Sequence, residues 1–278
     1  MFFRKKNPKN EIEIVVEPVE PFNVYGFSDV LHFIKREIGV DLFPKKYIIE
    51  TRIKVFCEEN GFNSFKKLFD ELQYNNDIKQ KLINLVTVNE TYFYRELPQL
   101  LEAVEFAKTR ESTVNIICAP CATGEEVYTI SMLLKEDKNF HNNYEIKGID
   151  INTEAITKAQ QGIYTERSLH KLTPELKNRY FIHENNMYKV DQSYFQNVKF
   201  MQVNIFENRF GDCGKFDIIF SRNMLIYFDE EFRLNAMKRF HEILKPGGRV
   251  YLGHADIVPE NNLFDKHGFG SSCYYTKR

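Results

Sequence analysis

Two apolar segments, each ending abruptly in residues suited to a turn, constrain the fold of this chain more than any other feature. Residues 116–118 are apolar, residues 119–124 are mostly small, and Glu125 and Glu126 then begin a helical pattern. A second apolar segment ends in Asp150. A strand, a small-residue turn, a helix and an acid at the tip of the next strand are typical of a Rossmann-like sheet that binds an adenosine-containing ligand.

The absence of two phosphate-binding motifs limits which adenosine-containing ligands the chain is expected to bind. The chain has no G-x-G-x-x-G motif for a pyrophosphate and no G-x-x-x-x-G-K-[ST] motif for a triphosphate. Carboxylates follow the turn instead, and negative charge attracts a cationic ligand. The pattern therefore favours S-adenosylmethionine, which carries a positive sulfonium group, over a nucleotide phosphate.

The spacing of apolar residues predicts two folded parts. Residues 1–24 are charged and contain three prolines, so they are interpreted as a flexible arm or a single added strand. Residues 25–88 have a helical period and predict a small all-helical domain with four helices. Residues 89–110 are interpreted as a linker that contacts the cofactor. Residues 111–278 alternate strands with helices, which predicts a mostly parallel sheet.

Residue types at the ends of the apolar patterns predict where several elements begin and end. Ser28 is predicted to cap the first helix and Gly39 to end it, and Ser64 is predicted to cap the third. Thr173 followed by proline predicts the start of a short helix. Residues 181–203 alternate like a hairpin and are interpreted as a small antiparallel insertion. In this interpretation Tyr188 and Val190 pair with Val198 and Phe200.

Composition excludes several classes of protein. Lys and Arg number 38 against 39 Asp and Glu, so the net charge of −1 gives no field that would draw the chain to nucleic acid. No apolar run is long enough to span a membrane, and the basic start is not followed by the apolar core of a secretory signal. Five scattered cysteines fit a reducing compartment. We expect a cytoplasmic protein without membrane insertion.

Cys118 and Cys121 have the C-x-x-C spacing of a redox motif or half a zinc site. Neither a second C-x-x-C nor a histidine at ligand spacing completes a metal site, since His141 and His254 are badly placed. The sequence therefore predicts structural thiols and no metal. His254 follows a glycine that ends a strand, and it is interpreted as a hydrogen-bonding turn residue rather than a base.

Motifs along most of the chain resemble those of one family. Residues 89–96 resemble the N-x-T-x-F-F-R element of bacterial chemotaxis receptor glutamate methyltransferases, and residues 119–128 resemble that family's T-G-E-E-x-Y turn. Residues 149–152 are similar to its D-I-D strand tip, and residues 216–228 to its F-D-x-I-x-C-R-N-x-x-I-Y-F block. Shorter matches at 162–164, 244–248 and 253–254 keep the family's order.

The resemblance implies an α/β fold: a Rossmann-like class I methyltransferase sheet with a small three-stranded antiparallel insertion, preceded by a small all-helical domain. It implies S-adenosyl-L-methionine as cofactor, with S-adenosyl-L-homocysteine as product. It also implies that the chain forms methyl esters on glutamate side chains in the cytoplasmic domains of chemotaxis receptors. The cofactor contacts implied by matching positions are Asn89, Thr91, Arg95, Ala119, Glu126, Asp150, Asn204, Ile205, Arg222 and Asn223.

Methyl transfer to a carboxylate is an in-line displacement, and the acceptor is already ionised at neutral pH. Catalysis therefore depends mostly on orientation and electrostatics. Arg95 is predicted to hold the incoming carboxylate or the cofactor's own carboxylate, and both roles remain open. Tyr227 is predicted to place a hydroxyl near the methyl group. Asp150 is expected to accept from ribose hydroxyls, while Asn204 and Ile205 border the adenine.

Each of these residues also has a structural alternative. Arg95 could be a surface arginine paired with Glu96 or Glu102. Asp150 could cap the helix that follows it. Tyr227 could be a core aromatic, and the neighbouring asparagine could be a simple turn residue.

Departures from the family's pattern bear on partners. Family members that dock on a receptor's tail peptide carry a glycine-containing loop in the insertion. Here no glycine occurs between Gly162 and Gly211, and the candidate turn is at residues 183–186. Tethering to a tail peptide is therefore not expected. Asn152 replaces the second acid of the D-I-D element, a change interpreted as tolerable.

The leading hypothesis is a cytoplasmic, S-adenosylmethionine-dependent glutamate methyltransferase of chemotaxis receptors that acts as a monomer. One alternative keeps the fold and cofactor but changes the acceptor to another protein or a small molecule. A second is an S-adenosylmethionine-binding adaptor with weak catalysis that acts by protein contact. The retained Arg95, Asp150 and Tyr227 argue against the adaptor.

Overall fold

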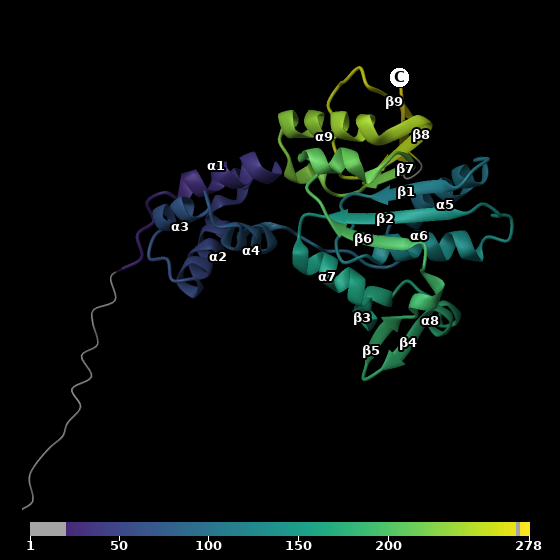
Figure 1. Ribbon diagram of the computed structural model, residues 1–278, viewed down its shortest axis with the longest axis horizontal. Coiled ribbons are helices and arrows are strands. Elements are labelled where there is room, and N and C mark those ends of the chain that lie inside the picture. The colour runs from purple at the N-terminus through teal and green to yellow at the C-terminus, as the bar shows by residue number, and fades with distance from the viewer. Residues whose placement is uncertain (1–20, 271–272) are drawn as a thin grey trace, which may run out of the picture.

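The computed structural model describes residues 21–270 and 273–278, so most of the predicted arm at residues 1–24 lies outside the described residues. A group of helices occupies one end of the described chain and a sheet the centre (Figure 1). The helices at that end are α1 (Phe27–Ile38), α2 (Lys46–Glu59), α3 (Phe65–Glu71) and α4 (Asn76–Val86), with a short 3₁₀ helix η1 (Phe43–Lys45). Their apolar faces enclose a separate core around Leu31, Ile53 and Phe65.

Within the helical domain, two of the three predicted helix ends are confirmed. Gly39 ends α1 in the left-handed conformation, with φ 77°, and the Ser64 hydroxyl accepts from the backbone of Lys67 at the start of α3. The prediction that Ser28 caps α1 is wrong. The helix starts after Gly26, whose φ is 92° and whose hypothetical Cβ would lie 2.8 Å from the Lys66 backbone. A left-handed glycine packed that closely turns the chain before Ser28 is reached.

The larger sheet of the described residues has seven strands in the order β6-β2-β1-β7-β8-β10-β9. The first five pair in parallel, and β10 and β9 add an antiparallel hairpin at one edge. These strands are β1 (Val114–Cys118), β2 (Tyr144–Asp150), β6 (Val198–Gln202), β7 (Phe216–Ser221), β8 (Leu244–Leu252), β9 (Phe264–His267) and β10 (Tyr274–Lys277). The predicted, mostly parallel sheet is confirmed.

Helices cover both faces of this sheet, because successive side chains of each strand point to opposite sides. On β1, Ile116 packs with α5 (Leu97–Lys108), α6 (Glu125–Glu136) and α7 (Thr153–Gln161), whereas Ile117 packs with α9 (Glu230–Ile243). Figure 1 shows α9 on the side of the sheet opposite to α6 and α7. The strands are consequently apolar on both faces, as a three-layer α/β fold requires.

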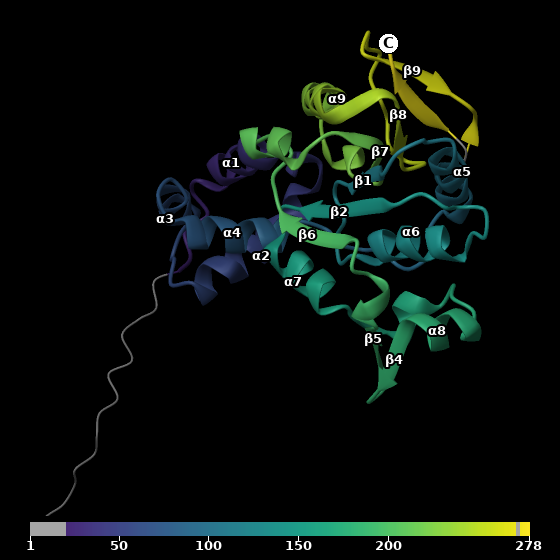
Figure 2. The same ribbon diagram turned by 45° about the vertical axis from the view of Figure 1, so that its right-hand side comes forward.

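The antiparallel insertion is present, and two of its three strands lie within the predicted residues 181–203, whereas the third precedes them. Its sheet has the order β3-β5-β4, made of β3 (Ile163–Thr165), β4 (Phe181–Glu184) and β5 (Met187–Val190). Three short elements lie beside it in the chain: η2 (Glu166–Leu169), α8 (Pro174–Tyr180) and η3 (Gln192–Tyr194). Thr173 caps α8 as predicted. In the turned view the insertion again lies apart from the central sheet (Figure 2).

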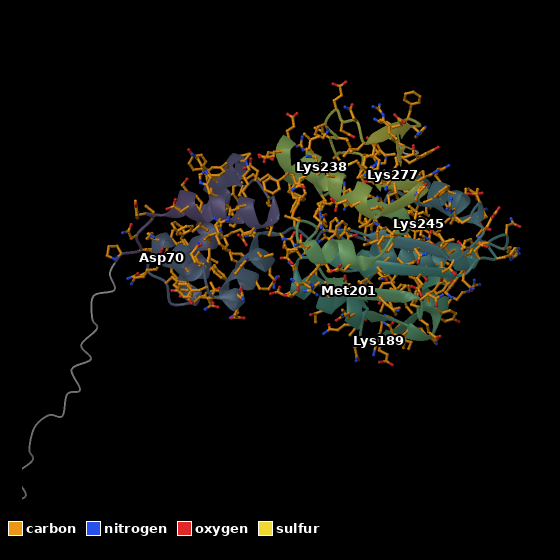
Figure 3. All side chains as sticks on the ribbon, turned by 45° about the horizontal axis from the view of Figure 1, so that its top comes forward. Asp70, Lys189, Met201, Lys238, Lys245 and Lys277 are labelled. Atoms are coloured by element: carbon orange, nitrogen blue, oxygen red, sulfur yellow. The ribbon has the colours of Figure 1, made fainter. Side chains whose placement is uncertain are left out.

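The predicted pairing of Tyr188 and Val190 with Val198 and Phe200 is wrong, and residues 198–202 do not belong to the insertion. Strand β6 pairs in parallel with β2, so Lys189 and Met201 lie in different sheets (Figure 3). The reason is the two-residue turn between β4 and β5, where two asparagines have φ near 50° and 59°. Asparagine tolerates this conformation, so the predicted turn closes without glycine and fixes β4 as the partner of β5.

The helical domain contacts the sheet directly. The Asp41 backbone N–H donates to the Tyr227 carbonyl at 2.8 Å, and the Asn84 amide donates to the Thr153 hydroxyl at 2.8 Å. Among the described residues, no helix combines the length and apolar character needed to cross a membrane.

We expect that replacing Asn152 by alanine lowers the free energy of unfolding by about 2–3 kcal/mol. The buried Asn152 side chain caps α7 by accepting from the Ala155 N–H at 2.9 Å. It also donates to the Asn84 carbonyl and the Thr87 hydroxyl of the helical domain, at 3.2 and 2.8 Å. Urea unfolding measures the change.

The matched control is Asn75→Ala, because Asn75 caps α4 in the same way, whereas its side-chain amide donates to Glu71 within the helical domain. The free energy of unfolding of that variant should fall by about 1 kcal/mol, the usual cost of removing one helix cap. Equal losses in the two variants would contradict the bridging role of Asn152.

Candidate active site

A cleft lies at the carboxyl ends of β1, β2 and β7, where the sheet meets the helical domain. It has two lobes of about 750 Å³ and about 620 Å³. The lobes are continuous, because both are lined by Val88, Pro120, Ala122, Asn223 and Tyr227. Ligands of open α/β sheets bind at this edge of the strands.

The first lobe is mostly apolar. Four of the predicted cofactor contacts line this lobe alone: Asn89, Asp150, Asn204 and Ile205. The helical domain supplies part of the wall through Ile38 and Val40, which motif matching did not identify. The only available signal was that these apolar residues lie at and just beyond the end of the first predicted helix. The site therefore spans both folded parts.

Asp150 ends β2 and is buried at the floor of this lobe, with 5% of its surface exposed. Its two oxygens accept from the Ala122 and Asn152 backbone N–H groups, each at 2.9 Å. Burial raises the pKa of Asp150, and these N–H groups oppose that shift. The alternative that Asp150 caps the next helix is wrong, because the cap of α7 is Asn152.

Asn204 and Ile205 follow β6 and are both buried. The Asn204 amide donates to the Glu37 carbonyl of α1 at 2.9 Å, and its oxygen accepts from the Phe206 N–H at 3.0 Å. Asn204 thus holds the helical domain against the lobe, while Ile205 contributes apolar surface.

The second lobe is more polar. Four other predicted contacts, Thr91, Arg95, Glu126 and Arg222, line this lobe alone, together with Glu90 and Cys121. The predicted residues Asn223 and Tyr227 line both lobes. Ala119 lines neither. It is fully buried, and its N–H donates to the Phe220 carbonyl between β1 and β7.

Arg95 is partly exposed at this lobe. Its guanidinium donates to the Glu90 carbonyl at 2.9 Å and lies 5.9 Å from the centre of the Tyr92 ring. No carboxylate of the described residues forms an ion pair with it. The surface alternative is wrong, because Glu96 pairs with Arg222 and Glu102 pairs with Arg249.

Arg222 is buried and joins the segments around the polar lobe. Its guanidinium donates to Glu126 at 2.6 Å and to the Arg95 carbonyl at 2.7 Å, and it pairs with Glu96 at 3.2 Å. The same Glu96 oxygen lies 2.8 Å from the His254 ring, so His254 has a polar turn contact, as the sequence predicts. Arg222 therefore fixes the backbone position of Arg95.

Glu126 lies in the first turn of α6 beside this network, with 13% of its side chain exposed. Burial raises its pKa, and the Arg222 charge opposes the shift. One carboxylate oxygen accepts from Arg222, and a hydrogen bond with the Cys118 thiol also opposes the rise in the pKa of this carboxylate. Glu126 also lines the polar lobe, where its carboxylate adds negative charge that attracts a cationic ligand.

Strained backbone gathers around the polar lobe. Tyr94 and Glu96 flank Arg95 with φ of 62° and 52°, and Ala122 and Asn223 have φ of 47° and 60°. Left-handed conformations cost free energy for residues other than glycine and cluster at functional sites. Asn223 is thus a turn residue, as one alternative held, and also lines the cleft.

Tyr227 ends the short helix η5 (Leu225–Tyr227) and is half-buried. Burial raises the pKa of its hydroxyl, and the nearby Arg95 charge opposes the shift. It packs on the edge of the core and borders both lobes, so it is not a fully enclosed core aromatic.

Cys118 and Cys121 are free and buried, and burial raises the pKa of both thiols well above its usual value. No cluster of three metal-ligating side chains occurs in residues 21–270 and 273–278.

The sequence analysis did not identify Glu96 and Asp256. Glu96 pairs with Arg222, and Asp256 accepts from the Asn223 backbone, so both support residues that line the cleft. Asp256 had one signal, because it is a carboxylate three residues after a glycine that ends a strand.

Two family models cover most of the chain. The model described as "CheR methyltransferase, SAM binding domain" matches residues 89–271, and the "CheR methyltransferase, all-alpha domain" matches residues 26–87. The fold and the cleft define an S-adenosylmethionine-dependent methyltransferase. Within that class, the chain belongs to the CheR methyltransferase family.

Relatives that match along most of their length are chemotaxis protein methyltransferases. The chain is 41% identical over 251 residues to the chemotaxis protein methyltransferase of Campylobacter jejuni, covering 90% of this chain and 95% of that protein. It is 36% identical to chemotaxis protein methyltransferase 2 of Vibrio cholerae, covering 84% and 85% of the two chains. It is 32% identical to the chemotaxis protein methyltransferase of Escherichia coli, covering 83% of each.

Proposed function

We propose that this chain transfers the methyl group of S-adenosylmethionine to glutamate side chains of chemotaxis receptors. The observation that carries the proposal is the two-lobed cleft. An apolar lobe with an acid suited to ribose hydroxyls joins a polar lobe in which Arg95 has no carboxylate partner among the described residues. A guanidinium free to bind a carboxylate is what an anionic acceptor requires.

The cofactor roles follow from the lobes. Asp150 would accept from the ribose hydroxyls, and Ile205 would border the adenine in the apolar lobe. Asn89 and Asn204 also line this lobe, and the Asn204 side chain holds the wall through the Glu37 carbonyl and the Phe206 N–H. Glu126 lines the polar lobe and would accept from the cofactor's ammonium group.

The remaining cofactor contacts lie at the junction of the lobes and beyond it. Thr91 and Asn223 line the polar lobe beside the methionine part of the cofactor. Arg222 acts mainly through its neighbours, because it fixes Glu126 and the Arg95 backbone. Ala119 would act only by placing the turn, since it does not line the cleft.

S-adenosylmethionine, when bound, supplies an electrophilic methyl group on a sulfonium. Arg95 would hold the acceptor carboxylate near that methyl group, and Tyr227, which lines both lobes, would offer its hydroxyl there. No general base is needed, because the acceptor is already ionised at neutral pH. The polar lobe supplies orientation and charge, which dominate a reaction of this kind.

Transfer of labelled methyl groups to receptor-containing membranes tests the proposal. Label should enter the receptor band and leave as methanol after mild base, because glutamate methyl esters are base-labile. Membranes without receptors, and receptors with glutamine at the acceptor positions, are the controls. Label on another molecule would favour a different acceptor, and cofactor binding without turnover would favour the adaptor.

We expect Tyr227→Phe to lower kcat by about tenfold or more while changing the Kd for S-adenosylhomocysteine by less than about threefold. Tyr227 lines both lobes, so its hydroxyl would act on the transferred methyl group while the phenylalanine ring would keep the shape of the cleft. Steady-state kinetics and calorimetry measure the two effects. An unchanged kcat would remove the hydroxyl from the mechanism.

The proposal also covers location and partners. We expect a cytoplasmic monomer, because the acceptors lie in the cytoplasmic domains of receptors. The two-residue turn at Asn185 and Asn186 replaces the glycine-containing loop of family members that bind a receptor's tail peptide. We therefore expect no heat of binding when such a peptide is titrated into the protein.

A further inference from the structure

Asp256 lies just beyond β8 and lines neither lobe of the cleft. Its carboxylate nevertheless accepts from two different segments of backbone. Oδ2 accepts from the Asn223 N–H at 2.7 Å and from the Gly253 N–H at 2.8 Å, and Oδ1 accepts from the Ile226 N–H at 3.2 Å. One carboxylate thus ties the end of β8 to the loop that follows β7.

The two segments approach each other so closely that no side chain fits between them. A Cβ at Gly253 would lie 2.6 Å from the Asn223 nitrogen and 2.9 Å from the Asp256 carboxylate. Asn223 itself has the left-handed φ of 60°. A non-glycine residue holds this conformation only when its surroundings impose it. The hydrogen bonds to Asp256 are the restraint that acts directly on the Asn223 N–H.

The restrained loop carries Asn223 and Tyr227 into the cleft, directly after Arg222. We infer that Asp256 is a positioning residue, which holds this loop in its binding conformation before the cofactor arrives. The inference rests on the cofactor and catalytic roles proposed for Asn223 and Tyr227. A preformed loop avoids the cost of ordering it on binding, so the benefit appears as cofactor affinity.

The carboxylate suits this task. Burial raises the pKa of Asp256, and the backbone N–H groups of Gly253, Asn223 and Ile226 oppose that shift. An amide in the same place would present one oxygen and one NH₂ group to N–H donors. At least one backbone donor would then lose its acceptor.

Calorimetric titration of the full chain with S-adenosylhomocysteine tests the inference. Asp256→Asn should raise the Kd by about tenfold or more, the cost of leaving a buried donor unpaired. The binding stoichiometry should stay near one, because the folded fraction is unchanged. The control is Asp191→Asn: Asp191 also accepts from a backbone N–H, that of Ser193, but lies outside the cleft. Its Kd should match that of the wild type.

Two results would overturn the inference. One is a Kd for Asp256→Asn within twofold of the wild type. The other is a reduced stoichiometry with an unchanged Kd, which is the signature of a merely structural residue. If the variant does not fold, hydrogen exchange of the ligand-free wild type decides. Protected Asn223 and Ile226 amides support the inference, and exchange as fast as in a surface loop refutes it. No acceptor enters these measurements, so failure of receptor methylation would not affect them.

Discussion

Replacement of Arg95 by alanine is expected to reduce methyl transfer by at least about 100-fold, the usual loss when one fixed group that stabilises developing charge is removed. Arg95 lines the polar lobe, and its guanidinium binds only a carbonyl and an aromatic ring among the described residues. Of the two arginines that line this lobe in the described residues, only Arg95 is free to hold the acceptor carboxylate, because Arg222 is already paired with Glu126 and Glu96. Initial rates of labelled-methyl transfer measure the loss.

The same variant distinguishes the two roles that the sequence left open for Arg95. If Arg95 holds the acceptor, the Kd for S-adenosylhomocysteine should change by less than about threefold while turnover falls. A large loss of cofactor affinity would instead assign Arg95 to the cofactor's carboxylate. Arg278→Ala is the control, since Arg278 is exposed, pairs with Asp265 and lines neither lobe. That variant should be fully active.

Replacement of Arg222 by methionine should lower the free energy of unfolding by about 3–5 kcal/mol, the cost of breaking a buried ion pair from one side. Glu126 and Glu96 would both lose their cation, and the Arg95 carbonyl would lose a donor. Urea unfolding measures the effect. Arg179→Met is the control, because its pair with Glu136 is exposed and should contribute less than about 1 kcal/mol.

The pH dependence of stability and a second substitution test whether unpaired carboxylates cause this loss of stability. Burial already raises the pKa of Glu126, and loss of the Arg222 charge would raise it further. A carboxyl group whose pKa is higher in the folded state favours folding as pH falls. The deficit of Arg222→Met should therefore shrink between about pH 8 and about pH 5. Adding Glu126→Gln to Arg222→Met should recover part of the lost stability. If neither lower pH nor Glu126→Gln restores stability, the unpaired charge of Glu126 is not the cause.

Sequence patterns predicted the parallel sheet and the helical domain because both depend on local periodicity. The residues that end β1 and β2 were placed correctly for the same reason, since strand tips follow directly from where apolar runs stop. Of the predicted site residues, only Ala119 lies outside the cleft lining. A turn residue can face the ligand or the sheet, and the sequence does not distinguish these directions.

Long-range pairing was harder to predict. The alternation of residues 181–203 suited a hairpin, but β6 instead continues the central sheet beside β2. A strand's period is the same in either sheet, so only the turn and the neighbouring strands decide between them. Asp256 was missed for a related reason, because its partners are backbone N–H groups far away in the sequence. Such groups are identical at every residue, so the position of Asp256 three residues after a strand-ending glycine was the one signal in the sequence.

Ile38 and Val40 of the helical domain form part of the apolar lobe, so the two folded parts share one binding site. Free energy released when the cofactor binds is spread over both folded parts, so each part stabilises the other through the ligand. A substitution in α1 can weaken cofactor affinity from a position outside the sheet. Grafting this methyltransferase sheet onto another helical module would consequently require a matching wall as well as a linker of suitable length.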